Sequence, residues 1–305
     1  MSRPDLFVLA VDQRPWLTQA LYSHTRMADP DQRAEICRGK HMVLDGLVAS
    51  IDSGIAVSPD SAAILVDPEL GPGVAERARA HGITVSMPLE KAGLDVYEDE
   101  PDDVGAYLAH HRPDLAKVLV RYNPEGDREA NDLQLRRLAS TARAVRDAGS
   151  RFMFELLVPP TPEHEAATGG RAAYDAEVRP GLILRGMEEV SASVPVDVWK
   201  LEPLGAERDY AAAAERAAST GGECIVLGAG APAADVETWV GRAARAGFSG
   251  FAVGRSIWWS AMRELLCGTM DHGVAVDQVA ERYVRLVVAF RRARTPSEDV
   301  SAVCS

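Results

Sequence analysis

A lysine lies in the middle of a short apolar segment, Val-Asp-Val-Trp-Lys-Leu at 196–201, which is typical of a buried strand. Burying an ammonium group is costly unless the group is paired or loses its proton, and one outcome is a depressed lysine pKa. A neutral amine is a nucleophile that forms Schiff bases with carbonyl compounds, so Lys200 is a candidate for imine catalysis. The alternative is a strand-edge lysine whose charged head reaches water, which is the commoner arrangement for lysine.

Other polar and charged side chains stand within or directly after further apolar segments. They are Asp12, Gln13, Arg14, Lys117, Arg121, Glu155 and Glu202, while Glu90 and Lys91 follow another such segment without an assigned role. A second buried lysine, Lys117, could hold Lys200 neutral by like-charge repulsion, although alone it would more often be structural. Glu155 has three apolar residues on each side and is a candidate for proton transfer. Asp12 and Arg14 fit a structural ion pair as well as they fit substrate contacts.

Two further segments end in residues suited to bind an anion. Gly228, Ala229 and Gly230 follow one apolar run, and Gly254 and Arg255 follow the next. A glycine-rich turn can bring backbone N–H groups close to a phosphate, and an arginine can bind phosphate through two hydrogen bonds. We therefore expect a phosphate site at this point of the fold.

The elements that must position these residues alternate regularly along the chain. Eight strand-like segments are predicted at 6–12, 62–67, 83–88, 116–122, 152–158, 196–201, 224–227 and 250–254. Helices with apolar residues every three or four positions are predicted at 31–53, 73–80, 102–111, 131–148, 181–193, 209–220 and 233–246. This alternation favours a single (β/α)₈ TIM barrel, in which functional residues lie at the carboxyl ends of the strands. An open doubly wound sheet is the alternative, but Asp-Gln-Arg-Pro stands where a glycine-rich turn would be expected after its first strand.

Composition limits the classes of function. The chain has 305 residues, of which 47% are hydrophobic and 26% are charged, as in ordinary soluble proteins. A formal net charge of −12 argues against a nucleic-acid-binding or anionic-membrane surface. Four cysteines without a C-x-x-C pair suggest reduced thiols, and the seven histidines show no metal-ligand spacing. We expect a cytoplasmic protein without metal or cofactor, with a barrel at 1–293 and a disordered tail at 294–305.

At these motifs the sequence resembles a known family. The segments Trp-Lys-Leu-Glu-Pro-Leu at 199–204, Val-Leu-Gly at 226–228, Ala-Pro at 231–232 and Gly-Phe-Ala-Val-Gly-Arg-Ser-Ile at 250–257 carry the likeness. They closely resemble the aldolase-like domain fused to the bacterial 5-dehydro-2-deoxygluconokinase of inositol catabolism. The chain is more distantly similar to class I tagatose-bisphosphate and sulfofructose-phosphate aldolases, and the resemblance extends from the first strand to the last.

The resemblance implies a role for each matched residue. Lys200 would form the Schiff base, Lys117 would be the second lysine and Glu155 the acid and base. By the resemblance, Asp12 and Gln13 would be substrate contacts, and Gly254 with Arg255 would bind the phosphate. From the residues themselves we also count Arg14, Arg121 and Glu202 as substrate contacts, and Gly228, Ala229 and Gly230 as part of the phosphate site. The chain departs from the aldolases where Gly228 replaces a serine and where Arg121 replaces a commoner aromatic residue. Its motif also reads Lys-Leu-Glu-Pro, with the proline one position earlier than in the aldolases.

These observations predict a class I aldolase that cleaves a phosphorylated ketose or keto acid. The favoured substrate is 5-dehydro-2-deoxygluconate 6-phosphate, which would give dihydroxyacetone phosphate and malonate semialdehyde. Tagatose-bisphosphate and sulfofructose-phosphate are alternative substrate types. A barrel that binds a sugar phosphate without cleaving it is an alternative of another class, because a strand lysine can simply hold an anion. We expect no nucleic-acid or membrane partner, and we expect the protein to form a homo-oligomer.

Overall fold

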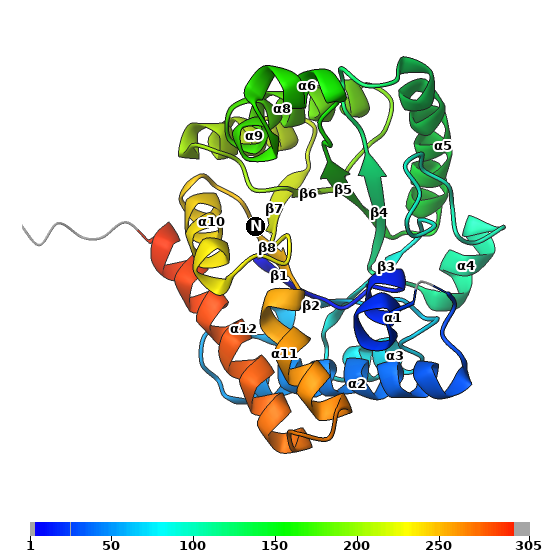
Figure 1. The fold of residues 1–305 in the computed structure, drawn as a ribbon, viewed down its shortest axis with the longest axis vertical. Helices are drawn as coiled ribbons and strands as arrows, with labels where there is room; N and C mark the ends of the chain where they lie inside the picture. The colour runs from blue at the N-terminus through cyan, green and yellow to red at the C-terminus, as the bar shows by residue number, and fades with distance from the viewer. Residues whose placement is uncertain (1–3, 25, 296–305) are drawn as a thin grey trace, which may run out of the picture.

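Eight parallel strands close into a barrel and pair in chain order, as the view along the barrel in Figure 1 shows. In the computed structural model, which describes residues 4–24 and 26–295, the strands are β1 (Leu6–Ala10), β2 (Ala62–Leu65), β3 (Thr84–Pro88), β4 (Leu115–Arg121), β5 (Arg151–Leu157), β6 (Val198–Leu201), β7 (Glu223–Leu227) and β8 (Gly250–Val253). Each strand begins and ends within two residues of its predicted segment. The predicted (β/α)₈ barrel is therefore confirmed.

Helices surround the strands (Figure 1). They are α1 (Pro15–Tyr22), α2 (Pro30–Asp52), α3 (Val74–Ala80), α4 (Val104–His111), α5 (Arg128–Asp147), α6 (Pro162–Thr168), α7 (Arg171–Ala173), α8 (Arg179–Ser191), α9 (Glu207–Ser219), α10 (Ala233–Arg245), α11 (Arg255–Leu266) and α12 (His272–Arg294), with a 3₁₀ turn η1 (Pro59–Ser61) and a π-helical turn η2 (Tyr174–Val178). The predicted set has no counterpart of α1, α6, α7, α11 or α12. Helix α12 continues through Arg294, and residues 296–305 of the expected tail lie outside the described residues.

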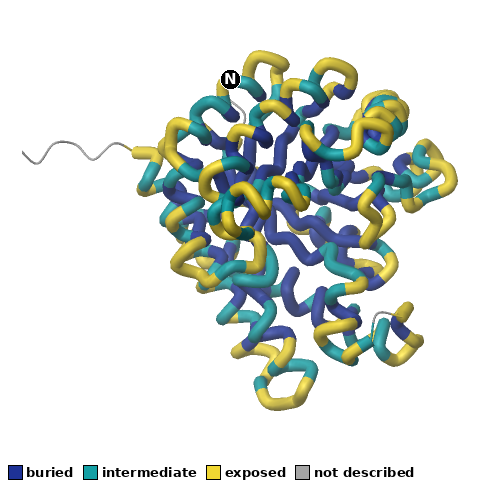
Figure 2. Tube along the Cα trace, turned by 45° about the horizontal axis from the view of Figure 1, so that its top comes forward, coloured by how far each residue is buried: buried dark blue, intermediate teal, exposed yellow. Residues whose placement is uncertain are grey.

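Alternate residues of each strand face the barrel interior, whose lower part is apolar. The interior cluster contains Leu6, Val8, Ala10, Ala63, Leu65, Leu115, Met153, Val198, Ile225 and Ala252. The intervening strand residues, among them Phe7 and Leu9, belong to the larger core between strands and helices. Figure 2 shows the strands buried at the centre and the loops exposed around them.

The same alternation places charged residues directly above the apolar interior. Side chains two residues apart on a strand share a face. Lys117 follows Leu115, Glu155 follows Met153 and Lys200 follows Val198 in this way. The charged side chains therefore face one another at the carboxyl end of the barrel, where functional residues of this fold lie.

Two glycines allow the last strand to close against the first. A Cβ atom on Gly250 would lie 1.8 Å from the carbonyl oxygen of Leu6, and one on Gly254 would lie 2.2 Å from that of Ala10. No side chain can be accommodated at such distances from backbone atoms, so both positions require glycine.

Candidate active site

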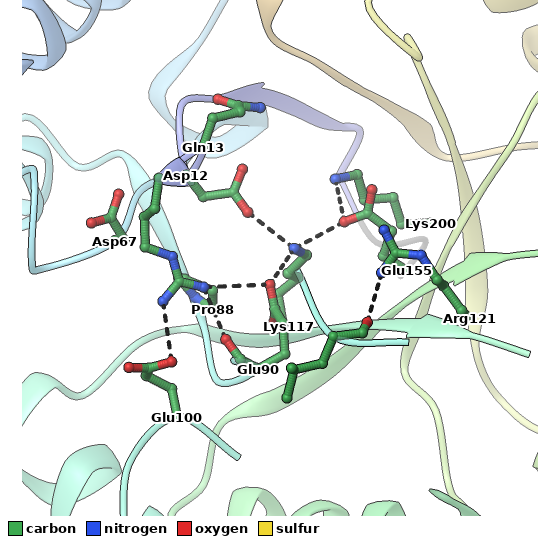
Figure 3. A network of polar contacts seen from close by, with 12 residues as sticks. Asp12, Gln13, Asp67, Pro88, Glu90, Glu100, Lys117, Arg121, Glu155 and Lys200 are labelled. Atoms are coloured by element: carbon green, nitrogen blue, oxygen red, sulfur yellow. Dashed lines mark hydrogen bonds and ion pairs between the residues drawn. The ribbon is translucent and has the colours of Figure 1, made fainter. Parts of the chain in front are cut away.

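Lys117 is at the centre of a buried cluster of charges (Figure 3). Its Nζ atom lies 3.0 Å from Asp12 Oδ2, 2.8 Å from Glu90 Oε1 and 3.0 Å from Glu155 Oε2. The three carboxylates come from the ends of β1, β3 and β5, so folding of the barrel is what brings them together. They raise the pKa of Lys117 well above its usual value, even though its burial acts in the opposite direction. Lys117 is therefore an ammonium ion.

Lys200 shares one of these carboxylates. The register of the neighbouring strands β5 and β6 sets Glu155 beside Lys200, and Lys200 Nζ lies 2.8 Å from Glu155 Oε2. Glu155 Oε2 thus lies between the two lysines, 3.0 Å from Lys117 Nζ and 2.8 Å from Lys200 Nζ. An amine paired in this way must transfer its proton before it can act as a nucleophile, and Glu155 is positioned to accept that proton.

The three carboxyl groups differ in their tendency to ionise. Burial alone would raise the pKa of Asp12, but the charges of Lys117 and Lys200 outweigh it and lower the pKa to about 2. The pKa of Glu155 is likewise lowered, because the same lysines outweigh its burial. Burial dominates at Glu90 and raises its pKa. The two lysines thus lower the pKa of Asp12 and Glu155, whereas burial raises the pKa of Glu90.

A cavity of about 150 Å³ opens beside this cluster. Its lining includes Asp12, Gln13, Arg14, Glu90, Lys117, Arg121 and Glu155. Within the described part of the chain, Gln13 Oε1 and Glu90 Oε2 are buried there without a hydrogen-bond partner. Unpaired buried polar atoms are costly, so these two oxygens indicate where polar groups of a ligand would bind.

The two arginines of the cavity have different surroundings. Arg14 donates to the carbonyl oxygen of Glu90 at 2.9 Å, and its guanidinium lies 3.9 Å from the carboxylates of Glu90 and Glu100. Arg121, at the end of β4, donates to the carbonyl oxygen of Leu94 at 2.9 Å. Arg14 thus belongs to the ion-paired cluster, whereas Arg121 holds the loop that follows β3.

The predicted anion-binding residues also come together. Arg255 is the first residue of α11 and donates to the carbonyl oxygen of Ala229 at 3.2 Å, in the turn after β7. A Cβ atom on Gly230 would lie 2.5 Å from the guanidinium of Arg255, so glycine permits this contact. The guanidinium also lies 4.7 Å from the ring centroid of Trp16. The turn at 228–230 and Arg255 are therefore in direct contact.

Glu202 is placed apart from the lysines. Its carboxylate lies 3.3 Å from Arg179 and accepts a hydrogen bond from the backbone N–H of Val158 at 2.8 Å. These contacts join β6 to the segment after β5 and to α8. Among the described residues, no contact links Glu202 to Lys200, Lys117 or Glu155, so its expected role as a substrate contact stays a prediction.

Two features of the site were not assigned from the sequence. Glu90 is the third carboxylate on Lys117, and its position directly after a strand was the available signal. Lys40 and Asp67 form a fully buried ion pair, and Lys40 also lies 3.4 Å from the carbonyl oxygen of Gln13. Lys40 stands on the buried face of α2, and Asp67 follows β2. Sequence alone could not show that the pair supports the loop after β1.

The described residues contain no group of three or more histidine, cysteine, aspartate and glutamate side chains that could hold a metal ion. Across the same part of the chain, no helix is both long enough and apolar enough to cross a membrane.

Residues 1–294 match a sequence family described as uncharacterized protein conserved in bacteria, DUF2090. The chain belongs to the DUF2090 family. No curated protein matches the sequence.

Several solved structures share the fold of this DUF2090 protein. A Plasmodium falciparum fructose-bisphosphate aldolase has a TM-score of 0.61 and 12% sequence identity, over 94% of this chain and 90% of the aldolase. An archaeal fructose-1,6-bisphosphate aldolase, described with its catalytic lysine covalently bound to the carbinolamine intermediate, has a TM-score of 0.54 and 13% identity, over 92% and 95% of the two chains. A Slackia heliotrinireducens fructose-bisphosphate aldolase has a TM-score of 0.55 and 14% identity, over 90% and 85%. At these identities the likeness establishes the shared barrel.

Proposed function

We propose that this protein is a class I aldolase, in which Lys200 forms a Schiff base with the ketone of a phosphorylated ketose or keto acid. The observation that carries the proposal is the buried contact of 2.8 Å between Lys200 and Glu155 at the carboxyl end of the barrel. It pairs a nucleophile with a base, which is what imine formation needs. The resemblance to Schiff-base aldolases and the barrel shared with an aldolase described as a carbinolamine complex support it.

The proposed reaction begins with the proton of Lys200. The ammonium group gives this proton to Glu155, and the amine attacks the ketone carbon to form a carbinolamine. Glu155 then protonates the departing hydroxyl group. Overall, ammonium and ketone give a protonated imine and water, and Glu155 is again a carboxylate. Lys117 stays an ammonium ion throughout and stabilises negative charge that develops nearby.

Carbon–carbon cleavage follows from the charge on the imine. Glu155 accepts the proton of the substrate hydroxyl group, the aldehyde is released, and the electron pair of the broken bond moves to the imine nitrogen as an enamine forms. Protonation of the enamine carbon and hydrolysis of the imine release the second product. The favoured substrate is 5-dehydro-2-deoxygluconate 6-phosphate, because the motifs resemble those of the aldolase-like domain fused to the sugar kinase of inositol catabolism. Its phosphate would bind at Arg255 and the turn at 228–230.

One alternative deserves a separate test. A barrel that binds a sugar phosphate without cleaving it is favoured by the same ion pair, because Lys200 paired with Glu155 could be purely structural. Gly228 also lacks the hydroxyl group that the aldolases have at this position, and this favours the barrel that binds without cleaving.

Borohydride trapping separates the two functions. Dihydroxyacetone phosphate and sodium borohydride should add covalent mass to Lys200 of the full chain, and Lys200→Met should take up none. Lys91→Met is the matched control, because Lys91 lines the cavity beside the charged cluster but is exposed and forms an ion pair with Glu98. It should be labelled as the parent is. Label on another lysine would refute the assignment of Lys200, and binding of the ketone phosphate without label would support the binding module.

A further inference from the structure

The cavity beside Lys117 contains more positive than negative side chains, although the chain as a whole has a formal net charge of −12. Four cations and three carboxylates line it, namely Arg14, Lys91, Lys117 and Arg121 with Asp12, Glu90 and Glu155. A local excess of cations within an acidic protein indicates an anionic ligand.

All four cations have carboxylate partners, but the partner of Arg121 is the most exposed of them. Lys117 contacts three carboxylates, Arg14 lies within 3.9 Å of two, and Lys91 lies 3.3 Å from Glu98. Arg121 differs from them. Within the described residues its one carboxylate neighbour is Asp95, at 3.8 Å, and that side chain is 96% exposed.

The guanidinium of Arg121 has capacity for a ligand. Nη1 donates to the carbonyl oxygen of Leu94, and no acceptor for Nη2 is found in the described part of the chain. A contact with one exposed carboxylate at 3.8 Å contributes little in water and is easily replaced. The free N–H groups along one edge of the guanidinium match the two oxygens of a carboxylate.

Arg121 stands at the outer end of the cavity. Lys117, Leu119 and Arg121 are alternate residues of β4, they share the interior face, and all three line the cavity. Successive residues on one face of a strand are about 7 Å apart, so the wall rises from the charged cluster past Leu119 to Arg121. Figure 3 shows Arg121 to the side of Lys117, near Glu155 and Lys200 in that view. The side chain can therefore contact the end of a substrate whose middle lies at the lysines.

We propose that Arg121 binds a carboxylate on the half of the substrate that leaves as the aldehyde, at the opposite end from the phosphate at Arg255. This inference rests on the proposed aldolase function and specifies its substrate class. A second phosphate is the other anion that could lie here. A carboxylate fits better, because a single arginine offers one free edge here and two oxygens are enough to fill it.

A binding experiment tests Arg121 without requiring catalysis. The probe is 3-hydroxypropanoate, the unreactive alcohol with the length and charge of malonate semialdehyde, and calorimetry gives its dissociation constant with the full chain. A hydrogen-bonded ion contact of this kind predicts binding about 10-fold to 100-fold weaker in Arg121→Gln. The binding of neutral 1-propanol should be the same in the parent and in Arg121→Gln.

Arg137→Gln is the matched control. Arg137 donates to the carbonyl oxygen of Tyr97 at 2.7 Å and holds the same loop after β3, and its side chain is 35% exposed against 33% for Arg121. It does not line the cavity. Arg137→Gln should bind 3-hydroxypropanoate as the parent does. Equal weakening in both variants would mean that the loop, and not a charge contact, controls binding, and the proposal would be wrong.

Two further results separate this inference from the aldolase proposal. Trapping of dihydroxyacetone phosphate on Lys200 of the parent chain tests the aldolase separately, because that ketone lacks the carboxylated half. If trapping succeeds and the dissociation constant of 3-hydroxypropanoate is the same in the parent and in Arg121→Gln, the carboxylate site is refuted and the aldolase proposal stands. If trapping fails but Arg121 controls 3-hydroxypropanoate binding, the aldolase fails while the site stands. A dependence on Arg121 for glycerol 3-phosphate alone would assign a phosphate there instead and overturn the proposal.

Discussion

At the scale of single residues, the cluster around Lys117 explains why a lysine in an apolar strand is tolerated. Asp12 and Glu90 accept hydrogen bonds from its ammonium group, and Glu155 forms an ion pair with it at 3.0 Å. Removal of any one of them would leave a buried charge short of a partner, which is a costly change. The site is therefore electrostatically interdependent, and single substitutions within it test stability as well as catalysis.

The sequence singled out Lys117, Glu155 and Lys200, but it did not predict their contacts. A charged residue inside an apolar segment was the signal for Lys117, Glu155 and Lys200, and the structure brings all three together. Glu202 carried the same signal yet pairs with Arg179. A strand pattern tells which residues are exceptional, whereas the direction of a side chain beyond the strand end depends on the loop geometry.

Arg255 carries a prediction at the same scale. If it binds the substrate phosphate, Arg255→Ala should lower kcat/KM for dihydroxyacetone phosphate by roughly 10-fold to 150-fold, since a hydrogen bond to a charged group contributes about 1.5–3 kcal/mol. Turnover of dihydroxyacetone, which lacks the phosphate, should be nearly unchanged. Steady-state rates of aldol condensation with the two ketones measure both effects.

Ser256→Ala is the matched control for Arg255→Ala. Ser256 donates to the carbonyl oxygen of Ala231 at 2.7 Å, so it joins the same helix end to the same turn without a charge. Its loss should affect the two ketones alike. Equal losses for both ketones in Arg255→Ala would instead mean that Arg255 only holds the turn through Ala229 and Trp16.

At the scale of elements, the strands were predictable and several helices were not. Each strand is a short apolar run, and runs of that kind are visible in the sequence with boundaries accurate to two residues. Helix α12 has a clear apolar pattern, with Val279, Tyr283, Val287 and Phe290 buried. It follows the eighth strand and its helix, so the eight β/α units of the barrel were already complete without it. Its tie to the barrel, from the hydroxyl group of Tyr283 to the carbonyl oxygen of Phe7 at 2.6 Å, joins residues 276 positions apart. Local patterns do not predict such contacts.

The closure between β8 and β1 gives a prediction about an element. Gly250→Ala places a methyl group against the carbonyl oxygen of Leu6, a backbone atom that cannot move without separating the strands. We expect a loss of about 3 kcal/mol in the free energy of unfolding, at the upper end for overpacking. Urea unfolding followed by circular dichroism measures it.

Gly181→Ala is the companion substitution. Gly181 lies in α8, and a Cβ atom there would meet no atom within 4 Å. Alanine in a helix interior should raise stability by about 0.5–1 kcal/mol. If Gly250→Ala did not lower the free energy of unfolding relative to Gly181→Ala, the close approach of β8 to β1 would not constrain the barrel.

At the scale of the whole molecule, the charge cluster links stability to pH. The pKa of Asp12 is about 2 in the folded protein and has a reference value of 3.8. A carboxyl group with a lowered pKa stabilises the fold at pH values above the reference value, and this contribution is lost as the pH falls toward the folded-state value. For Asp12 the contribution is about 2 kcal/mol at neutral pH. Acid should therefore weaken the barrel at its catalytic end.

Asp12→Asn tests this linkage, because asparagine keeps the shape of the side chain and removes the charge. At pH 6 the variant should be less stable than the parent, since Lys117 loses one of its three carboxylates. The difference in the free energy of unfolding should shrink by about 1 kcal/mol between pH 6 and pH 3, where the parent has lost about half of the Asp12 contribution. Asp95→Asn, at a side chain that is 96% exposed, should show a difference that does not vary with pH. A difference for Asp12→Asn that stays constant or widens toward pH 3 would mean that the lysines do not hold this carboxylate in its ionised form, and the arrangement of charges proposed for the resting site would be wrong.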